Sequence, residues 1–195
     1  MVADAGVFFG LWLQKPLQIA AVCPSSTRAA MAMARLVDLA RPGPVLELGA
    51  GTGSLTRGLL RAGCPPDRLI AFEREERLVA ILRRQCRGVT AIGGDAIELD
   101  RHLSELGVER LSTVVSSLPI KWFPLELQRA VVQPCLKRLG PGGHFLQLTN
   151  AFASPLPIAP LGIAGRQVAR VWPNLPPAQI WSYTERSTPA AGRAR

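Results

Sequence analysis

Histidine, paired cysteine and long apolar runs are all scarce in this chain of 195 residues. Its only histidines are His102 and His144, and its four cysteines form no Cys-x-x-Cys pair, so no zinc-ligand spacing is present. No apolar run approaches the roughly 20 residues that a membrane-crossing helix needs, because Arg, Asp, Gly or Pro interrupts every candidate. We therefore expect a reduced protein with no metal site and no transmembrane segment.

Acidic residues and lysines are also few. The sequence has 14 Asp and Glu against 23 Lys and Arg, which gives a formal net charge of +9. This excess favours a polyanionic partner, either nucleic acid or an anionic membrane surface, and the charge alone does not choose between them. Only three of the 23 basic residues are lysines, so an arginine-rich genome explains the excess equally well.

The N-terminus lacks the features of a secretion signal. An apolar stretch lies around residues 7–13, but no basic segment precedes it and no convincing small-x-small cleavage site follows it. We therefore expect the protein to be cytoplasmic.

The sequence does contain a regular alternation of short apolar runs and helical patterns from Gly43 onward. The runs are typical of buried strands, and the helices between them place their apolar residues on one face. This alternation predicts an α/β fold with a mostly parallel sheet and helices on both faces. The expected strands are 45–48, 69–72, 89–92, 111–115, 144–148, 166–172 and 179–183.

The pattern divides the chain into three parts. Residues 1–41 form an N-terminal helical segment that caps the membrane or substrate side, with a helix expected at 26–40. Residues 42–186 form the α/β domain, in which the Pro-rich stretch 151–165 is expected to be an insertion loop. Residues 187–195 are small, polar and basic, and we expect a flexible tail.

A glycine-rich loop, Glu47-Leu-Gly-Ala-Gly-Thr-Gly53, follows the first expected strand and opens a helix. Gly49 and Gly51 can adopt positive φ and bring the backbone close to a ligand, while Gly53 lets the helix start near that ligand. The loop begins with an acid, Glu47, which would repel a pyrophosphate but attract the ammonium group of an amino-acid moiety. This favours S-adenosylmethionine over a nicotinamide dinucleotide as the cofactor.

Two further acids end the next two strands. Glu73 can accept hydrogen bonds from both ribose hydroxyls, and Asp95 can accept one from the adenine amino group. With Glu47, these acids resemble the cofactor site of the class I S-adenosylmethionine-dependent methyltransferases. The resemblance implies a Rossmann-like sheet of seven strands with the last one antiparallel. Ala50, Thr52, Arg74 and Ala96, which lie beside these acids and glycines, also belong to the candidate cofactor site, together with Ser25, Ser26 and Ser116 from elsewhere in the chain.

The segment Ser116-Ser-Leu-Pro-Ile120 resembles the Asn/Asp-Pro-Pro-aromatic motif of amino-group N-methyltransferases. The resemblance implies that Ser117, Leu118 and Pro119 hold the acceptor nitrogen through a side-chain oxygen and a backbone carbonyl. In rRNA adenine dimethyltransferases the aromatic residue of the motif stacks on a flipped adenine. Here Ser117 stands in place of Asn and Ile120 in place of the aromatic residue, so that stacking platform is missing.

Taken whole, the chain is similar to the bacterial phospholipid N-methyltransferase family. The similarity includes Pro-Ser-Ser at 24–26, the glycine loop, Ser-Ser-Leu-Pro at 116–119, Gln-Leu-Thr at 147–149 and Asn-Leu-Pro-Pro-Ala at 174–178. It implies stepwise methylation of phosphatidylethanolamine towards phosphatidylcholine, peripherally at the inner face of the cytoplasmic membrane and with no nucleic-acid partner. An RNA adenine N-methyltransferase is the alternative, and a membrane-binding module that keeps the fold without activity is a third interpretation.

The chain offers several candidates for contact with a phospholipid substrate. The apolar segment 4–15 has a helical face that suits a lipid interface. Elsewhere, aromatic residues can form walls around a methylated cation, and lysine or amide side chains can bind a phosphate or another polar part of the headgroup. The candidates are Trp12, Lys15, Lys121, Asn150, Trp172 and Tyr183.

Overall fold

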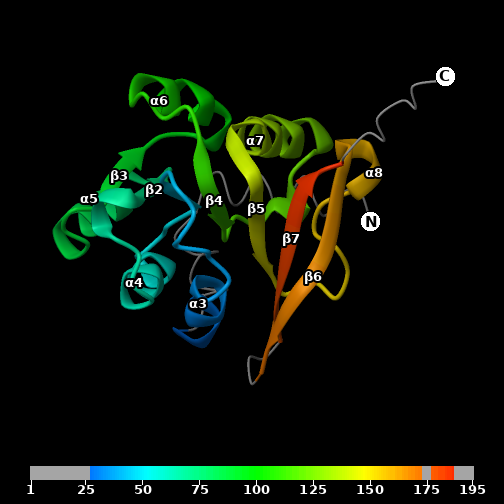
Figure 1. The fold of residues 1–195 in the computed structure, drawn as a ribbon, viewed down its shortest axis with the longest axis horizontal. Helices are drawn as coiled ribbons and strands as arrows, with labels where there is room; N and C mark the ends of the chain where they lie inside the picture. The colour runs from blue at the N-terminus through cyan, green and yellow to red at the C-terminus, as the bar shows by residue number, and fades with distance from the viewer. Residues whose placement is uncertain (1–26, 173–176, 187–195) are drawn as a thin grey trace.

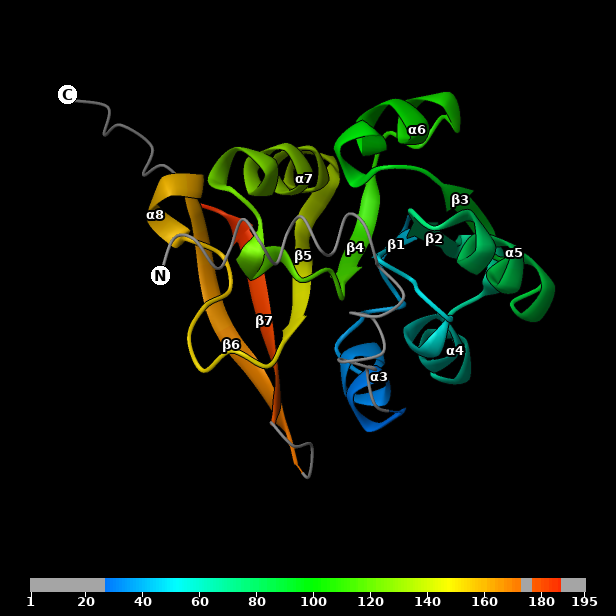
Figure 2. The same cartoon turned by 180° about the vertical axis from the view of Figure 1, so that it is seen from behind.

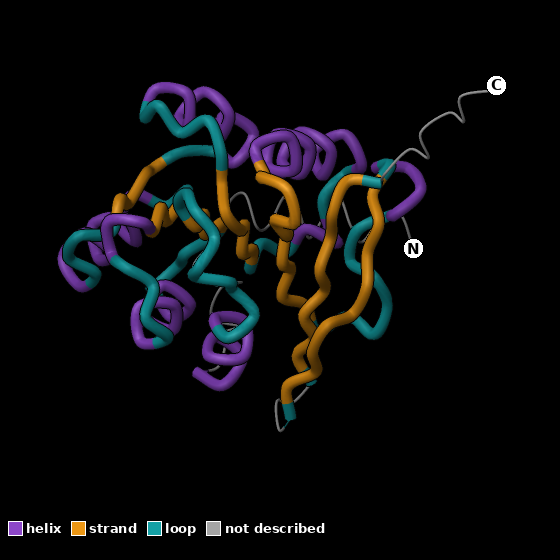
Figure 3. The backbone as a smooth tube through the Cα atoms, viewed as in Figure 1, coloured by secondary structure: helices purple, strands orange, loops and turns teal. Residues whose placement is uncertain are grey.

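Strands and helices alternate along the part of the chain that the computed structural model describes, residues 27–172 and 177–186. Figure 3 distinguishes the strands, helices and loops by colour. The strands are β1 (Val45–Leu48), β2 (Leu69–Glu73), β3 (Thr90–Gly93), β4 (Leu111–Ser116), β5 (Leu139–Thr149), β6 (Ile163–Val171) and β7 (Ala178–Glu185). The α-helices are α3 (Thr27–Ala34), α4 (Ser54–Arg61), α5 (Glu76–Gln85), α6 (Leu99–Glu105), α7 (Leu125–Arg138) and α8 (Ile158–Leu161). Short 3-10 helices are η1 (Pro66–Arg68), η2 (Ala96–Glu98) and η3 (Ile120–Trp122).

The seven strands form one sheet in the order β3-β2-β1-β4-β5-β7-β6 (Figure 1). Neighbouring strands from β3 to β5 are parallel, and β7 runs antiparallel to both β5 and β6. This confirms the expected α/β fold with seven strands and an antiparallel last strand. The strand order reverses between β1 and β4, and ligands of open α/β sheets bind at such a switch point.

Helices cover both faces of the sheet (Figures 1 and 2). α6, α7 and α8 pack over one apolar face that includes Leu46, Phe72 and Phe145. α3 and α4 cover the opposite face, where Val45 and Val115 are fully buried. No helix among the residues described is both long and apolar enough to cross a membrane.

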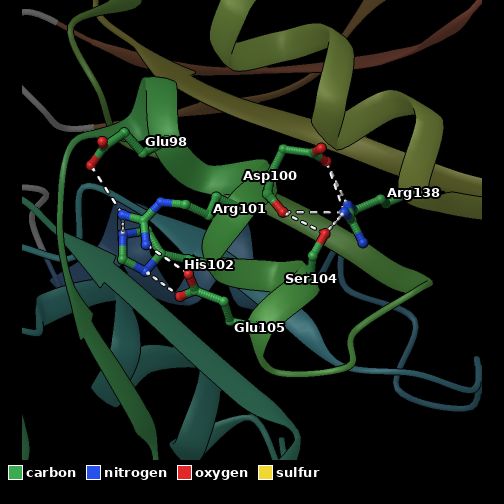
Figure 4. A network of polar contacts seen from close by, with 7 residues as sticks. All are labelled: Glu98, Asp100, Arg101, His102, Ser104, Glu105 and Arg138. Atoms are coloured by element: carbon green, nitrogen blue, oxygen red, sulfur yellow. Dashed lines mark hydrogen bonds and ion pairs between the residues drawn. The ribbon is translucent and has the colours of Figure 1, made fainter.

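A polar network fixes α6 against α7 (Figure 4). Arg138 of α7 lies 2.8 Å from a carboxylate oxygen of Asp100 and donates to the Ser104 hydroxyl, while Arg101 pairs with Glu98 and Glu105 on its own helix. The side chain of Arg138 is mostly buried, whereas that of Arg101 is 54% exposed. The exposed pairs therefore contribute little stability, and the Arg138 contact determines how α6 docks.

Three predicted boundaries were wrong. The helix expected at 26–40 ends at Ala34, because Leu36 and Val37 continue in tight turns with bonds to residues three positions earlier. β5 begins at Leu139 rather than at 144, and its pairing with β4 shifts register across the glycines at 140–143. The expected loop 151–165 contains α8 and the start of β6, since Leu161 and Ile163 are buried in the core.

Candidate functional site

The glycine loop lies at the carboxyl end of β1, where the strand order reverses. Its first backbone N–H groups, of Gly49 and Ala50, donate to the carbonyl oxygen of Phe72 at 2.9 and 3.2 Å, which ties the loop to β2. Gly49, Gly51 and Gly53 have φ of 73°, 56° and 81°, a region that disfavours residues with a side chain. The glycines are therefore required by the backbone of this loop, as the sequence predicted for Gly49 and Gly51; the positive φ of Gly53 was not predicted.

Glu47 is fully buried beneath the loop. Its Oε2 accepts a hydrogen bond of 2.7 Å from the Thr56 hydroxyl, whereas its Oε1 has no hydrogen-bond partner. Burial raises the pKa of Glu47 from 4.5 to about 8. A cation that reaches Oε1 would supply the missing partner and stabilise the ionised form.

Glu73 lies on the other side of the loop and has a different environment. Its Oε2 accepts from the Gly51 N–H at 2.8 Å, and its Oε1 accepts from the N–H groups of Arg74 and Glu75 at 2.8 and 3.0 Å. A carboxylate has about four acceptor positions, so this arrangement leaves about one for a ligand. In this conformation Glu73 can accept one ribose hydroxyl fully, and acceptance of both requires the Gly51 contact to lengthen.

Asp95 follows β3 and is half-buried. Its Oδ1 accepts from the Ile97 N–H at 3.2 Å and so caps η2. The Oδ2 atom of Asp95 has no bond within the described residues and is available to a donor such as an adenine amino group. Ala96 packs against the core, while Ile97 beside it is 50% exposed. Sequence reasoning missed Ile97, whose exposed apolar side chain suits the face of a flat ring.

The segment after β4 contacts the glycine loop directly. The Ser117 hydroxyl donates to the Gly49 carbonyl oxygen at 2.7 Å, so it can only accept a bond from a ligand. A Cβ at Gly49 would lie 2.8 Å from Leu118 Cδ2, so the loop and the Leu118 side chain are closely packed. Ser116 is fully buried, and its Oγ accepts from the Leu118 N–H at 3.4 Å.

A buried glutamine that sequence reasoning did not single out as a site residue completes this region. Gln147 of β5 lies beside Ser116 in the sheet register, and its Nε2 donates to the Leu118 carbonyl oxygen at 3.0 Å. Trp181 pairs with Gln147 from β7, and Gln179 lies two residues earlier on that strand. These residues lie within strands. The Gln-Leu-Thr segment at 147–149 was part of the family resemblance, but the sequence assigned Gln147 no role.

The substrate candidates are dispersed. Tyr183 is fully buried, its hydroxyl lies 2.7 Å from the Ser154 hydroxyl, and burial raises its pKa to about 12. The structure therefore places Tyr183 in the core rather than around a substrate. Lys121 is exposed with its Nζ 5.3 Å from the Trp122 ring centroid, and Asn150 is half-buried just past β5. The substrate candidates Trp12 and Lys15 and the cofactor candidates Ser25 and Ser26 lie outside the described residues.

Trp172 lines a surface pocket of about 400 Å³ between α3 and the end of β6. Its ring is 64% exposed, and the guanidinium of Arg170 lies 5.8 Å from the ring centroid. Arg28 of α3 and Arg35, which directly follows α3, line the same pocket with Arg170, and within the described residues none of the three arginines forms an ion pair. This pocket is suited to an anion, and Arg170 already occupies one face of Trp172.

Known proteins resemble this chain in sequence. A family model described as a methyltransferase domain matches residues 45–143. An ornithine lipid N-methyltransferase of Singulisphaera acidiphila is 32% identical over 150 residues, which cover 75% of this chain and 78% of that protein. A ribosomal RNA small subunit methyltransferase A of Phenylobacterium zucineum is 34% identical over 102 residues, but these cover 47% of this chain and only 34% of that protein.

A solved structure matches the fold. The magnesium protoporphyrin IX methyltransferase of Synechocystis PCC 6803, which contains bound S-adenosylmethionine, superposes with a TM-score of 0.57 at 14% identity. The match covers 82% of this chain and 79% of that one, so the fold is shared over most of both proteins.

Proposed function

Because the chain belongs to the class I S-adenosylmethionine-dependent methyltransferases, we propose that it methylates the amino group of a membrane lipid, converting phosphatidylethanolamine towards phosphatidylcholine. The similarity to an ornithine lipid N-methyltransferase over most of both chains carries this proposal. By its name, that relative methylates a lipid nitrogen. The protein would then act peripherally at the inner face of the cytoplasmic membrane.

The residues of the glycine loop fit S-adenosylmethionine. The unpartnered Oε1 of Glu47 is suited to the ammonium group of the cofactor, which would compensate the buried negative charge. Glu73 and Asp95 retain acceptor positions for a ribose hydroxyl and the adenine amino group. When bound, the cofactor supplies a methyl group that its sulfonium makes electrophilic.

Methyl transfer demands alignment more than acid–base chemistry. With the cofactor bound, the segment 116–120 would hold the neutral amine with its lone pair towards the methyl group. The methylated nitrogen would then release a proton to water, since this segment contains no histidine or carboxylate to accept it. Ser117 suits the alignment because its hydroxyl, already donating to Gly49, can accept an amine N–H but cannot donate to the nitrogen lone pair.

The pocket lined by Arg28, Arg35 and Arg170 supports a lipid partner. Basic residues near an anionic membrane surface contribute about 1 kcal/mol each to binding. Trp172 belongs to the same pocket and is largely exposed, and aromatic rings favour the membrane interface. We propose that this edge of the sheet faces the lipid headgroups, with the N-terminal segment 4–15 as a second contact.

RNA adenine methylation is the competing function, since rRNA methyltransferases are also similar to this chain. One assay separates the two: labelled S-adenosylmethionine is incubated with the protein and either phosphatidylethanolamine vesicles or unmodified rRNA. We expect label in the lipid. Label in RNA alone would replace the proposal with its competitor, and label in neither would favour an inactive membrane-binding module.

A further inference from the structure

The side-chain amide of Gln147 lies beside the segment 116–120, here called the acceptor segment because it is proposed to hold the methyl acceptor. Only the nitrogen of this amide forms hydrogen bonds. Its Nε2 donates to the carbonyl oxygens of Leu118 at 3.0 Å and Leu148 at 2.7 Å. Gln147 is 1% exposed, and its Oε1 has no hydrogen-bond partner. A strong acceptor is therefore buried at the carboxyl ends of β4 and β5 with nothing to accept.

The hydrogen bonds fix the orientation of this amide. Both N–H groups of Nε2 have carbonyl acceptors, and rotating the amide by 180° would point Oε1 at those two carbonyl oxygens instead. The rotated form would place acceptor against acceptor twice. Oε1 is consequently held on the opposite side of the amide from the Leu118 carbonyl.

The backbone carbonyl of the acceptor segment has no capacity left for a substrate. The Leu118 carbonyl oxygen accepts from Gln147 Nε2 and from the Ile120 N–H at 2.7 Å, and a carbonyl oxygen has two lone pairs. Ser117 offers a hydroxyl where related motifs have an amide oxygen. An amine held by this segment therefore lacks its second acceptor, and Gln147, whose Nε2 is bonded to the Leu118 carbonyl oxygen, has a buried amide oxygen without a partner.

Unpartnered polar atoms concentrate around this position. Seven buried side-chain nitrogen and oxygen atoms of the described residues have no partner, and four of them belong to Gln147, Gln179 and Trp181. These residues are neighbours on β5 and β7. Buried polar atoms are normally hydrogen-bonded, so a cluster of exceptions indicates that a ligand completes the bonding.

We infer that Gln147 Oε1 accepts an N–H of the substrate's amino group and, with Ser117 Oγ, turns the nitrogen lone pair towards the methyl donor. This assignment rests on the proposed lipid amine substrate. The number of N–H groups that the substrate can donate to Gln147 and Ser117 falls as its nitrogen is methylated. A neutral primary amine has two N–H groups to offer, a monomethylated amine has one, and a dimethylated amine has none.

The test compares Gln147→Met with the wild-type protein on phosphatidylethanolamine and its monomethyl and dimethyl derivatives in mixed micelles. Methionine keeps the length and packing but removes both the acceptor and the donors. We expect kcat/KM for the primary amine to fall about 10- to 100-fold, less for the monomethyl lipid and little for the dimethyl lipid. Binding of each lipid in the presence of S-adenosylhomocysteine extends the comparison to any step that the wild type does not catalyse.

Gln128→Met is a matched control. Gln128 is also buried, donates from Nε2 to the Phe123 carbonyl oxygen at 2.8 Å and has an unpartnered Oε1, but it lies on α7 and bonds to Phe123 rather than to Leu118. Both variants are expected to lower the melting temperature, and only Gln147→Met should change the order of preference among the three lipids. An equal loss on all three lipids, or none, would overturn the assignment. A wild-type protein that labels no lipid would instead defeat the proposed function itself.

Discussion

Two regions at the same end of the sheet hold their polar groups in different ways. The proposed cofactor edge is formed by the carboxyl ends of β1 to β3, and the proposed acceptor edge, named for the methyl acceptor, is formed by β4, β5 and β7. At the first edge, acids at strand ends interact with nearby loops and helices: Glu73 binds the N–H groups of Arg74 and Glu75, and Glu47 binds Thr56. At the second edge, Gln147 is interior to its strand and contacts Leu118, 29 residues away. Glu73 thus has two partners directly after it in the chain besides Gly51, 22 residues earlier, whereas the contact of Gln147 with Leu118 depends on the pairing of β4 with β5.

Even within the first edge, Glu47 and Glu73 differ. Glu73 accepts hydrogen bonds from three backbone N–H groups, whereas Glu47 is fully buried and its hydrogen-bonding partner is Thr56. The carboxylate of Glu47 thus lacks hydrogen-bond partners that a ligand could supply, whereas that of Glu73 has nearly all of its acceptor positions filled. Five predictions test these contrasts and the surface pocket, from the largest expected effect to the smallest.

Glu47→Gln should nearly abolish cofactor binding. The substitution removes the only charge that compensates a buried ammonium group, and breaking such a pair costs about 3–5 kcal/mol, or more than 100-fold in affinity. Isothermal titration with S-adenosylmethionine measures the loss. An affinity close to that of the wild type would show that the ammonium group of the cofactor does not bind Glu47.

The same substitution should stabilise the cofactor-free protein at alkaline pH. The folded pKa of Glu47, about 8, lies above the ordinary 4.5, so the folded state binds more protons between these values and stability falls as pH rises through them. Glu47→Gln should remove a decline of about 1.4 kcal/mol per pH unit in this window. Urea unfolding from pH 5 to 9 tests the slope.

Glu73→Gln is the contrasting variant in the same experiment. Its amide nitrogen would face at least one backbone N–H, so we expect lower stability at every pH, by about 1–3 kcal/mol. If the free energy of unfolding fell with pH at the same rate in the wild type and in Glu47→Gln, Glu47 would not differ from Glu73 in the way proposed.

Alanine substitutions at Gly49 and at Gly51 should have different functional effects, one on the acceptor edge and one on the cofactor edge. Both positions have positive φ, so both variants are expected to lose about 1–2 kcal/mol of stability to backbone strain. A Cβ at Gly49 meets Leu118, whereas the nearest atom to one at Gly51 is the Gly49 carbonyl oxygen, 4.0 Å away. Gly49→Ala should therefore mainly lower methyl transfer and Gly51→Ala mainly cofactor affinity. Equal effects on both measurements would mean that the edges are not separable.

The smallest effect is expected at the surface. Arg35→Gln should weaken co-sedimentation with phosphatidylglycerol vesicles by about 1 kcal/mol, roughly fivefold, at low salt and by less at high salt. The exposed Arg84 on α5 lies outside the pocket, and Arg84→Gln serves as the control. Equal losses for the two variants would indicate attraction by net charge rather than by the pocket.

The sequence by itself determined the α/β fold, the glycine loop and the acids at the ends of the first three strands. These features are readable because strand periodicity, positive-φ glycines and strand-end acids are local properties of the chain. The boundaries around 35–40 and 139–143 were not readable, since tight turns and a register shift depend on packing and pairing.

Only the tertiary structure decided which polar groups come together at the acceptor edge. It buried Tyr183 in the core, placed Trp172 beside three arginines, and brought Gln147 to Leu118. Each of these outcomes depends on which strands pair and in which register, and a shift of one residue would turn Gln147 to the opposite face of the sheet. The spacing of residues along the chain does not contain that information.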